Sequence, residues 1–415
     1  MEKAKSFDIS KHVVLEAYKR VKVNQGSAGI DKVSIAAFEK QLKDNLYKIW
    51  NRMCSGSYFP PPVKAVAIPK KQGGERILGV PTVSDRVAQM VVKLYFEPKV
   101  ESLFHQDSYG YRPGKSAHQA LAATRKRCWR FNWLIEYDIV GLFDNIPHDL
   151  MMRAVKKHTD CKWIRLYIER WLKAPMQQED GARVQRIKGT PQGGVISPLL
   201  ANLFLHYAFD HWMRVNFPNN PWARYADDGV VHCRTEQEAK DLLGKLAERF
   251  HECGLELHPE KTRFIYCKDD DRRGEYPQTK FDFLGFTFRP RRAMDRYGRY
   301  FVSFLPAISN KAAKAIRQTV HDWRIHLKPD KSLIDLSRIF NPIIRGWIEY
   351  YGRFYKSALY PTLKHLNRAL VHWARLKFKR FHKRRRRAKR WLGRIAQQEP
   401  WLFAHWKMGI KPTTG

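Results

Sequence analysis

The chain has 415 residues, 44% of them hydrophobic, which is enough to bury one large or several modest cores and excludes a wholly disordered protein. Lysine and arginine (77) outnumber aspartate and glutamate (40), and the net charge of +37 predicts a polyanionic partner, with nucleic acid first. No apolar run approaches the roughly 20 residues of a membrane-spanning helix, and the N-terminus lacks a signal-peptide core. We therefore expect two or three domains in a soluble, cytoplasmic protein with no membrane partner.

The cysteines are scattered, with no CxxC pair and no histidine grouping at the spacing of zinc ligands. They are Cys54, Cys128, Cys161, Cys233, Cys253 and Cys267. This pattern predicts reduced thiols and counts against a zinc-bearing nuclease module.

Along the first 300 residues, helical and strand-like patterns alternate. The predicted helices include Ser84–Val100 and His148–His158, and the predicted strands include Trp133–Val140, Ala223–Cys233 and Phe281–Pro290. The charged, turn-rich stretch Lys268–Lys280 is expected to be an exposed loop inside a domain.

From Asn310 onward the pattern becomes helical throughout. Apolar residues recur at three- and four-residue steps, which places them on one helix face. They are Leu363, Leu366, Leu370, Trp373 and Leu376. No acid occurs between Glu349 and Glu399, whereas Lys364–Arg394 holds fourteen lysines or arginines. The sequence thus predicts an α+β domain followed by a basic helical one.

Three aspartates stand where a carboxylate is costly. Asp138 ends an apolar run, and Asp227 lies beside Asp228 between two apolar runs, so their charges need compensation. Oxygen ligands of this kind suit magnesium rather than zinc. Two such ions about 4 Å apart can activate a 3′-hydroxyl and stabilise the leaving pyrophosphate.

Local reasoning alone leaves a simpler explanation open. An Asp-Asp-Gly sequence between two strands is most often a hairpin turn, because Asp and Gly are favoured there. Asp138 could equally be a helix cap or a solvated strand end.

The stretch Tyr225-Ala226-Asp227-Asp228 matches the catalytic signature of reverse transcriptases, and its Ala form is typical of those encoded by group II introns. Further blocks follow in the order of that family. They are Asn24–Asp31, Ile68–Gln89, Asp107–Leu121, Tyr137–Met151, Gly189–His206, Gly254–Phe264 and Phe281–Phe286. The chain therefore resembles the group II intron-encoded reverse transcriptases over nearly its whole length.

The resemblance implies a right-hand polymerase fold of class α+β, with fingers and palm over residues 1–300 and an N-terminal extension over about residues 1–60. An all-α basic thumb, the maturase or X domain, is expected over residues 301–395, followed by a short tail over 396–415. Because larger relatives carry a His-Asn-His endonuclease after the thumb, we expect target cleavage to be absent here. DNA primers would then come from elsewhere, for instance a nascent strand at a replication fork.

The resemblance assigns the catalytic roles. Asp138, Asp227 and Asp228 would be the ligands of two Mg²⁺ ions. Lys261 would lie near the polyphosphate and assist proton transfer to pyrophosphate, although a solvated lysine is an equal alternative.

The resemblance also implies a nucleotide site. Its members would be Lys70, Arg76, Arg112, Phe143, Gln192, Gly193 and Tyr225. Phe143 corresponds to the aromatic gate that occupies the space of a 2′-hydroxyl, and its alternative is an ordinary core aromatic. Arg112 would contact template or nucleotide phosphates, or merely pair with a nearby acid. The loop around Gln192 would line the pocket, where the alternative is a simple turn.

The segment Asn341–Lys356 resembles the core of the maturase domain, which grips the template–primer duplex and binds the parent intron RNA. The expected RNA contacts are Arg345, Arg353, Lys356, Arg375, Lys379 and Arg384. The aromatics between them can stack on bases, but most are expected to pack between helices. The basic run Lys379–Arg390 binds phosphates without reading sequence, and a solvated flexible arm is its alternative.

The resemblance implies a bacterial RNA-directed DNA polymerase that uses Mg²⁺ and dNTPs to copy an RNA template from a DNA primer. Its maturase part would form a ribonucleoprotein with the host group II intron RNA, assist splicing and retrohoming into target DNA, and bring the protein to the nucleoid. Two alternatives stay open: a domesticated relative acting in DNA repair or phage defence, and a maturase used only for splicing. The oligomeric state is also open.

Overall fold

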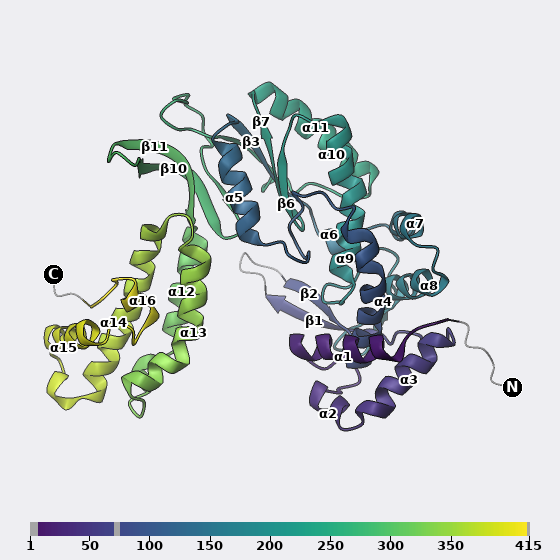
Figure 1. Ribbon diagram of the computed structural model, residues 1–415, viewed down its shortest axis with the longest axis horizontal. Coiled ribbons are helices and arrows are strands. Elements are labelled where there is room, and N and C mark those ends of the chain that lie inside the picture. The colour runs from purple at the N-terminus through teal and green to yellow at the C-terminus, as the bar shows by residue number, and fades with distance from the viewer. Residues whose placement is uncertain (1–6, 70–74, 413–415) are drawn as a thin grey trace. The chain divides into compact units, whose positions relative to one another are not determined.

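The computed structural model describes residues 7–69 and 75–412 (Figure 1). The chain forms two compact units. The first holds the residues up to Ala120 together with Ile135–Arg263, and the second holds Leu121–Leu134 together with the chain from Phe264 onward. The domain boundaries expected at residues 300 and 395 stay predictions. The second unit includes a small sheet in addition to the expected helices.

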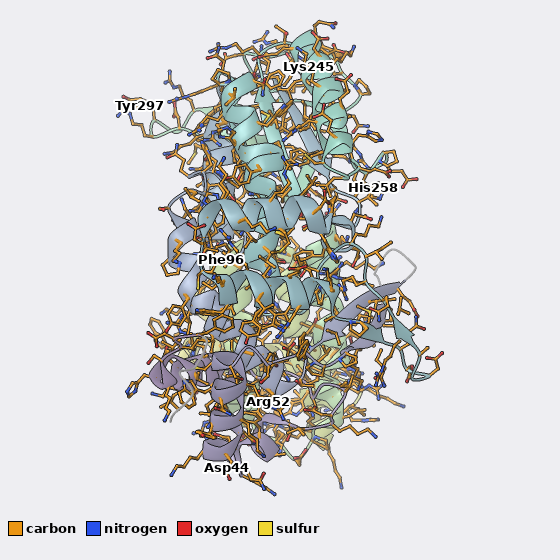
Figure 2. All side chains as sticks on the ribbon, turned by 90° about the vertical axis from the view of Figure 1, so that its right-hand side faces the viewer. Asp44, Arg52, Phe96, Lys245, His258 and Tyr297 are labelled. Carbon is orange, nitrogen blue, oxygen red and sulfur yellow. The ribbon has the colours of Figure 1, made fainter. Side chains whose placement is uncertain are left out.

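The N-terminal part of the first unit combines helices with a four-stranded sheet of order β2-β1-β4-β5. Its elements are α1 Lys11–Asn24, α2 Ile35–Glu39, α3 Leu42–Cys54, β1 Val63–Pro69, β2 Glu75–Val80, α4 Val83–Glu101, α7 His148–His158, α8 Lys162–Lys173, β4 Met176–Gln177 and β5 Arg183–Val184. Helix α4 confirms the helix predicted over Ser84–Val100. It begins where the Thr82 hydroxyl caps the backbone N–H of Asp85, and its Phe96 is fully buried, whereas Asp44 of α3 is exposed (Figure 2).

The rest of the first unit is built around strands β6, β7 and β3, which lie side by side in that order. Its elements are β3 Trp133–Asp138, α6 Leu142–Asn145, α9 Ser197–Leu205, the π-helix η1 His206–Asp210, α10 His211–Asn216, β6 Trp222–Tyr225, β7 Asp228–Cys233 and α11 Glu236–Glu252. The ring of Tyr137 on β3 lies 5.2 Å from that of Phe209 and 6.0 Å from that of Phe250. These aromatic contacts bury one face of the sheet against η1 and α11.

Three elements belong to both units or join them: α5 Ala117–Cys128, β3 and β8 Arg263–Tyr266. The stretch predicted as a loop, Lys268–Lys280, contains no helix or strand and is mostly exposed, as expected.

The second unit begins with a three-stranded antiparallel sheet of order β11-β10-β9. Its strands are β9 Phe281–Phe283, β10 Phe286–Met294 and β11 Tyr300–Ile308. The single strand predicted over Phe281–Pro290 is wrong, because the chain reverses at Leu284 and Gly285, both with positive φ (51° and 81°). A glycine inside an apolar run marks such a turn less clearly than a polar pair would.

Helices follow from Asn310 to the end of the described chain, as predicted. They are α12 Asn310–Asp322, η2 Ile325–Leu327, α13 Leu333–Tyr351, η3 Lys356–Leu359, α14 Tyr360–Lys377, η4 Lys379–Phe381, α15 Arg385–Gln398 and α16 Ala404–Lys407. On α14, four of the five apolar residues predicted to share one helix face are buried, but Leu376 is 50% exposed. Repeated three-residue steps fall short of a 3.6-residue turn, and Leu376 has therefore rotated off the buried face.

Within the described ranges, no helix is both long and apolar enough to cross a membrane. All six cysteines are free thiols, as the sequence predicted.

Candidate polymerase active site

The three aspartates come from two neighbouring strands. Asp138 is the last residue of β3, and Asp228 is the first residue of β7. Tyr225 pairs with Asp228 across the β6–β7 hairpin, whose turn is made by Ala226 (φ 59°) and Asp227. The carboxyl groups of Asp228 and Asp138 lie close enough for Asp138 to raise the pKa of Asp228. The single strand predicted over Ala223–Cys233 is therefore wrong, because the chain reverses at Ala226 and Asp227, while Asp228 and Gly229 already belong to β7. This turn lies beside the end of β3.

The carboxyl groups perturb one another. Burial, then repulsion from Asp227 and Asp138, raises the pKa of Asp228 to about 7, although this side chain keeps enough solvent exposure to screen part of the effect. Burial, followed by repulsion from Asp138, also raises the pKa of Asp227. Because the three carboxylates repel one another, the site favours either protonation of one carboxylate or the binding of a cation.

Lys261 provides a positive charge next to the cluster. Its Nζ lies 2.6 Å from Oδ2 of Asp138, and its side chain is 45% exposed. The backbone explains this contact, because the N–H of His258 donates to the carbonyl oxygen of Asp138 and the N–H of Lys261 donates to that of His258. The turn that carries Lys261 is therefore fixed against the end of β3.

Magnesium suits the donor set, since all three candidate ligands are carboxylates and their mutual repulsion is what a divalent cation relieves. Within the described residues, however, no three His, Cys, Asp or Glu side chains are gathered closely enough to hold a metal ion. The ion pair between Lys261 and Asp138 engages one of the carboxylates instead. The three carboxylates are thus the type of ligand that magnesium prefers, and Lys261 would compete with the ion for Asp138.

A fully buried arginine, Arg224, donates a hydrogen bond to the backbone of the β6–β7 turn. Arg224, on β6, is 0% exposed and forms a two-pronged ion pair with Asp210 of η1, at 2.9 and 2.8 Å. Its remaining donors reach Ser108 Oγ, Asn202 Oδ1 and the carbonyl oxygen of Ala226, at 2.8, 3.2 and 3.2 Å. The guanidinium thus connects Ser108, Asn202 and Asp210 to Ala226, the residue that precedes Asp227. We did not predict it, although an arginine inside an apolar strand is a signal for a buried partner.

Glycines allow close approach at the same place. A Cβ on Gly229 would lie 2.2 Å from the ring of Tyr137, and one on Gly110 would lie 2.5 Å from the backbone nitrogen of Ala226. The Asn202 side chain donates to the carbonyl oxygen of Gly110 at 2.8 Å. The β6–β7 turn is therefore closely packed on both sides.

The predicted nucleotide residues Arg76 and Gln192 contact each other, with Arg76 Nε donating to Gln192 Oε1. Gln192 Nε2 donates to Asp144 Oδ2 at 2.9 Å, and its carbonyl oxygen accepts from the N–H of Gly79 at 2.8 Å. Gly193 has φ 120°, and a Cβ there would meet the Gly79 carbonyl oxygen at 2.6 Å. The positive charge of Arg76 opposes part of the rise in the pKa of Asp227, which indicates that Arg76 lies near this carboxylate. Asp144 was missed by sequence reasoning.

Three aromatic rings lie next to the aspartates. The ring of Tyr111 is 6.4 Å from that of Phe143 and 6.5 Å from that of Tyr225. Phe143 is 8% exposed and its carbonyl oxygen accepts from the N–H of Thr190 at 2.6 Å. Burial and the nearby Asp227 raise the pKa of Tyr111. Tyr111 was also missed, although it lies next to Arg112 in a motif that the sequence singled out.

The loop that carries Gln192 is held by a buried polar network. Oε1 of Gln89 accepts from the N–H groups of Val195 and Ile196, at 2.7 and 3.3 Å, and Nε2 of Gln89 donates to Asp85. Asp85 also accepts from the side chains of Tyr58 and Trp171, at 2.9 and 2.7 Å. Helix α4 therefore fixes this loop through Gln89.

One predicted nucleotide contact, Lys70, lies outside the described residues. Another, Arg112, is engaged by groups other than the three aspartates. Arg112 is 6% exposed and pairs with Glu101 at 2.8 Å, while it also donates to the carbonyl oxygens of His105 and Ser108. This arrangement matches the second reading left open by the sequence, a pair with a nearby acid, and we leave Arg112 out of the proposed substrate site.

The cations predicted to bind RNA lie in the second unit, on or next to α13, η3, α14 and η4. Arg345, Arg353, Lys356, Lys379 and Arg384 are exposed, and Arg375 is half-buried. The aromatics of this region pack, as expected: Trp347 stacks on Trp323 at 5.4 Å, and the hydroxyl of Tyr350 donates to the carbonyl oxygen of Leu284.

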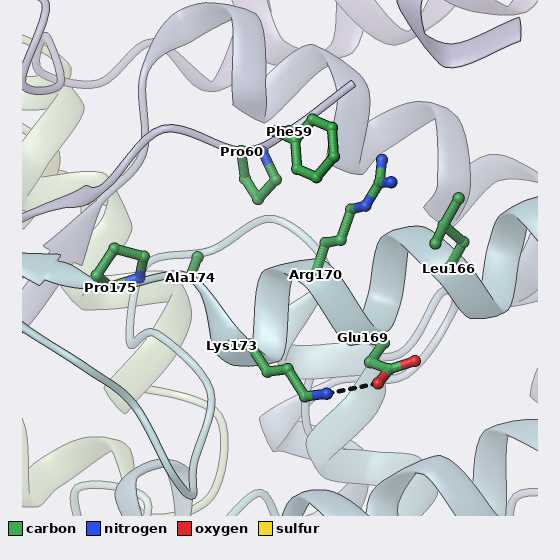
Figure 3. A pocket seen from close by; sticks show the side chains of 8 residues that line it. All are labelled: Phe59, Pro60, Leu166, Glu169, Arg170, Lys173, Ala174 and Pro175. Atoms are coloured by element: carbon green, nitrogen blue, oxygen red, sulfur yellow. Dashed lines mark hydrogen bonds and ion pairs between the residues drawn. The ribbon is translucent and has the colours of Figure 1, made fainter. Parts of the chain in front are cut away.

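A hollow of about 380 Å³ elsewhere in the first unit is lined by Phe59 and the end of α8 (Figure 3). Arg170 lies 3.8 Å over the ring of Phe59, and Lys173 pairs with Glu169 at 2.6 Å. None of the three aspartates lines it, so it is not part of the site described above.

Comparison with known proteins agrees with the geometry. Residues 68–288 match the reverse transcriptase (RNA-dependent DNA polymerase) family, and residues 313–391 match the group II intron, maturase-specific domain. The chain is 35% identical to Protein YkfC of Escherichia coli, over 65% of this chain and 77% of that protein. It is also 35% identical to the group II intron-encoded protein LtrA of Lactococcus lactis, over 81% of this chain and 68% of LtrA. A 91 kDa protein in the cob intron of Schizosaccharomyces pombe is 26% identical, over 86% of this chain and 51% of that protein.

With a reverse transcriptase domain, a maturase domain after it and these relatives, the chain belongs to the group II intron-encoded reverse transcriptases and is an RNA-directed DNA polymerase with a maturase part.

Proposed function

We propose that Asp138, Asp227 and Asp228 hold two Mg²⁺ ions and that this site extends a DNA primer on an RNA template. The observation that carries the proposal is that the end of β3 lies beside the β6–β7 turn, where Asp138 and Asp227 raise the pKa of Asp228. When bound, the ions would lower the pKa of the primer 3′-hydroxyl and neutralise the departing pyrophosphate.

Side chains around the aspartates would bind the incoming dNTP and donate a proton to the leaving group. Arg76, tied to Gln192 and beside Asp227, would meet the triphosphate of the incoming dNTP. Phe143 would fill the space of a ribose 2′-hydroxyl, with Tyr111 against its edge. Lys261 would leave Asp138 when metal binds and would then be free to donate a proton to the departing pyrophosphate.

We propose that the second unit binds group II intron RNA, supports its splicing and retrohoming into target DNA, and also holds the template–primer duplex. The support is the acid-free basic helices α14 and α15, which follow exposed cations such as Arg345 and Arg353. LtrA, a group II intron-encoded protein by name, matches over most of this chain.

The proposed polymerase and maturase activities can be separated experimentally. Asp227→Ala with Asp228→Ala should abolish primer extension on an RNA template, because no metal ligand remains at the turn. Filter binding of intron RNA and its splicing in vitro should be largely unchanged, since those carboxylates repel phosphate rather than hold it. A variant that loses splicing and extension together, while its RNA binding is intact, would refute this division of labour.

A further inference from the structure

Helices α14 and α15 pack together in the second unit (Figure 1). Residues of these two helices line a second cavity, of about 260 Å³. We call it the arginine pocket. It is lined by Arg368, Val371, His372, Arg375 and Arg385. Only one of these side chains is apolar, and the volume is below that of pockets for drug-sized ligands, which favours a small charged group.

The charge of the arginine pocket is not balanced locally. No acid occurs in the sequence between Glu349 and Glu399, and within the described ranges no ion pair joins the three arginines to a carboxylate. Nε of Arg375 is buried without a hydrogen-bond partner. Burial, together with His326 and Arg375, lowers the pKa of His372, as expected where a further positive charge is unwelcome. Three guanidinium groups beside one cavity, with no ion pair to a carboxylate in the described part of the chain, favour the binding of an anion.

The N-terminus of α15 adds to the excess of positive charge around the arginine pocket. The helix begins at Arg385, with no acid in its first turn and no side chain capping its N-terminus. The N-terminus is the positive end of the helix dipole and leaves backbone N–H groups unsatisfied. Arginines are unfavourable there by themselves, and an anion would satisfy both the helix end and the arginines.

We propose that the arginine pocket binds one phosphate group of RNA. The proposal rests on RNA binding by the second unit, as proposed above, and adds a defined site to it. Guanidinium groups donate in pairs to phosphate oxygens, and three of them around one small cavity suit a single tetrahedral anion better than an extended backbone. An internal phosphodiester and a 5′-terminal phosphate share this chemistry.

The first test uses inorganic phosphate and two matched full-length variants. The pocket variant is Arg368→Ala, Arg375→Ala and Arg385→Ala; the control variant is Lys364→Ala, Arg390→Ala and Arg394→Ala. The control removes the same charge from exposed positions of the same two helices. At constant ionic strength, replacing chloride by phosphate should raise the Tm of the wild type and of the control to a plateau, and should leave the Tm of the pocket variant unchanged.

A single substitution separates binding from a structural role. Arg385→Ala should raise Tm in phosphate-free buffer, because it removes a cation from a helix N-terminus, and should lower the gain that phosphate gives. If Arg385 served only the fold, its removal would lower Tm in both buffers, and that result would count against the pocket.

The second test measures RNA affinity against salt. If the three arginines hold one phosphate, each single alanine variant should lose nearly as much affinity as the triple variant. The slope of log affinity against log salt should then fall by about 0.9 in total on a duplex. RNA with a 5′-hydroxyl and RNA with a 5′-phosphate identify the source, because dependence on the arginine pocket only with the 5′-phosphate indicates a terminal group, and equal dependence indicates an internal one.

Several results would overturn the proposal: a phosphate-dependent rise in Tm that survives in the pocket variant, single losses that simply add up to the triple loss, or RNA affinity equal to that of the control. The last result leaves RNA binding itself intact. A wild-type protein that binds no RNA would instead refute the function proposed for the second unit.

Discussion

The proposed functions of the β6–β7 turn, with its aspartates, and of the basic thumb helices α14 and α15 both depend on charge, but the two regions are built differently. Around Asp227 and Asp228, buried groups fix each backbone segment, as Arg224 does with donors to Asp210, Ser108, Asn202 and Ala226. In the thumb, the cations that follow Glu349 are mostly exposed and have no acid near them in sequence. Chemistry at one atom requires position, whereas attraction to a polyanion requires mainly net charge. Mutations in the two regions should therefore differ in size and in kind.

The largest effect is expected at Arg224. Arg224→Met should destabilise the fold by about 3–5 kcal/mol in urea unfolding, because Asp210 is left buried without its partner. Adding Asp210→Leu should restore much of the stability, since it removes the isolated charge.

Activity should not recover in that double variant, because the carbonyl of Ala226 still lacks its donor. Primer extension should show a reduced kcat and a higher Mg²⁺ requirement at unchanged RNA affinity. Full activity in the double variant would mean that Arg224 stabilises the fold without positioning the turn.

The next effect concerns pH and Asp85. Burial raises the pKa of this carboxyl from 3.8 to about 6, so the folded state holds the proton more tightly than the unfolded chain. The contribution of Asp85 to stability is therefore greatest below pH 4 and falls by about 3 kcal/mol in total as pH rises from 4 through 6.

Urea unfolding of wild type and Asp85→Asn across pH 4 to 7 measures this contribution, because the difference between the two curves isolates Asp85. The variant should also raise KM for dNTP, since the amide disturbs Gln89 and the loop that Gln89 holds. A difference that is flat with pH would exclude this titration.

The smallest effect is expected for a single exposed thumb cation. Arg345→Ala should leave stability within about 0.5 kcal/mol and weaken RNA binding similarly for all sequences. The slope of log affinity against log salt should fall by about 0.9 at most. A loss confined to one RNA sequence would show that Arg345 reads a structure rather than a charge, and would weaken the contrast between the two regions.

Much of the fold was predictable because it depends on neighbours in sequence. Helix α7 has the predicted bounds, and the helices begin at Asn310 as expected, since periodicity and caps are local signals. Local patterns failed to predict two kinds of feature. At Leu284 and Gly285 the apolar pattern continues although the strand ends and the chain reverses. At Leu376 the apolar pattern continues although this position has rotated away from the buried face of the helix. Local signals carry no record of such turns and rotations.

By itself, the sequence determined the pair of acids in a hairpin, the third acid at a strand end, the basic helical C-terminal part and the family. Only the tertiary structure decided which cation meets which acid: Lys261 lies on Asp138, 123 residues away, while Arg112 pairs with Glu101. It also decided that Arg224 is buried beneath the turn and that three arginines from two helices line one cavity. Contacts between residues far apart along the chain depend on how elements pack, and packing is set by the whole chain rather than by any single stretch.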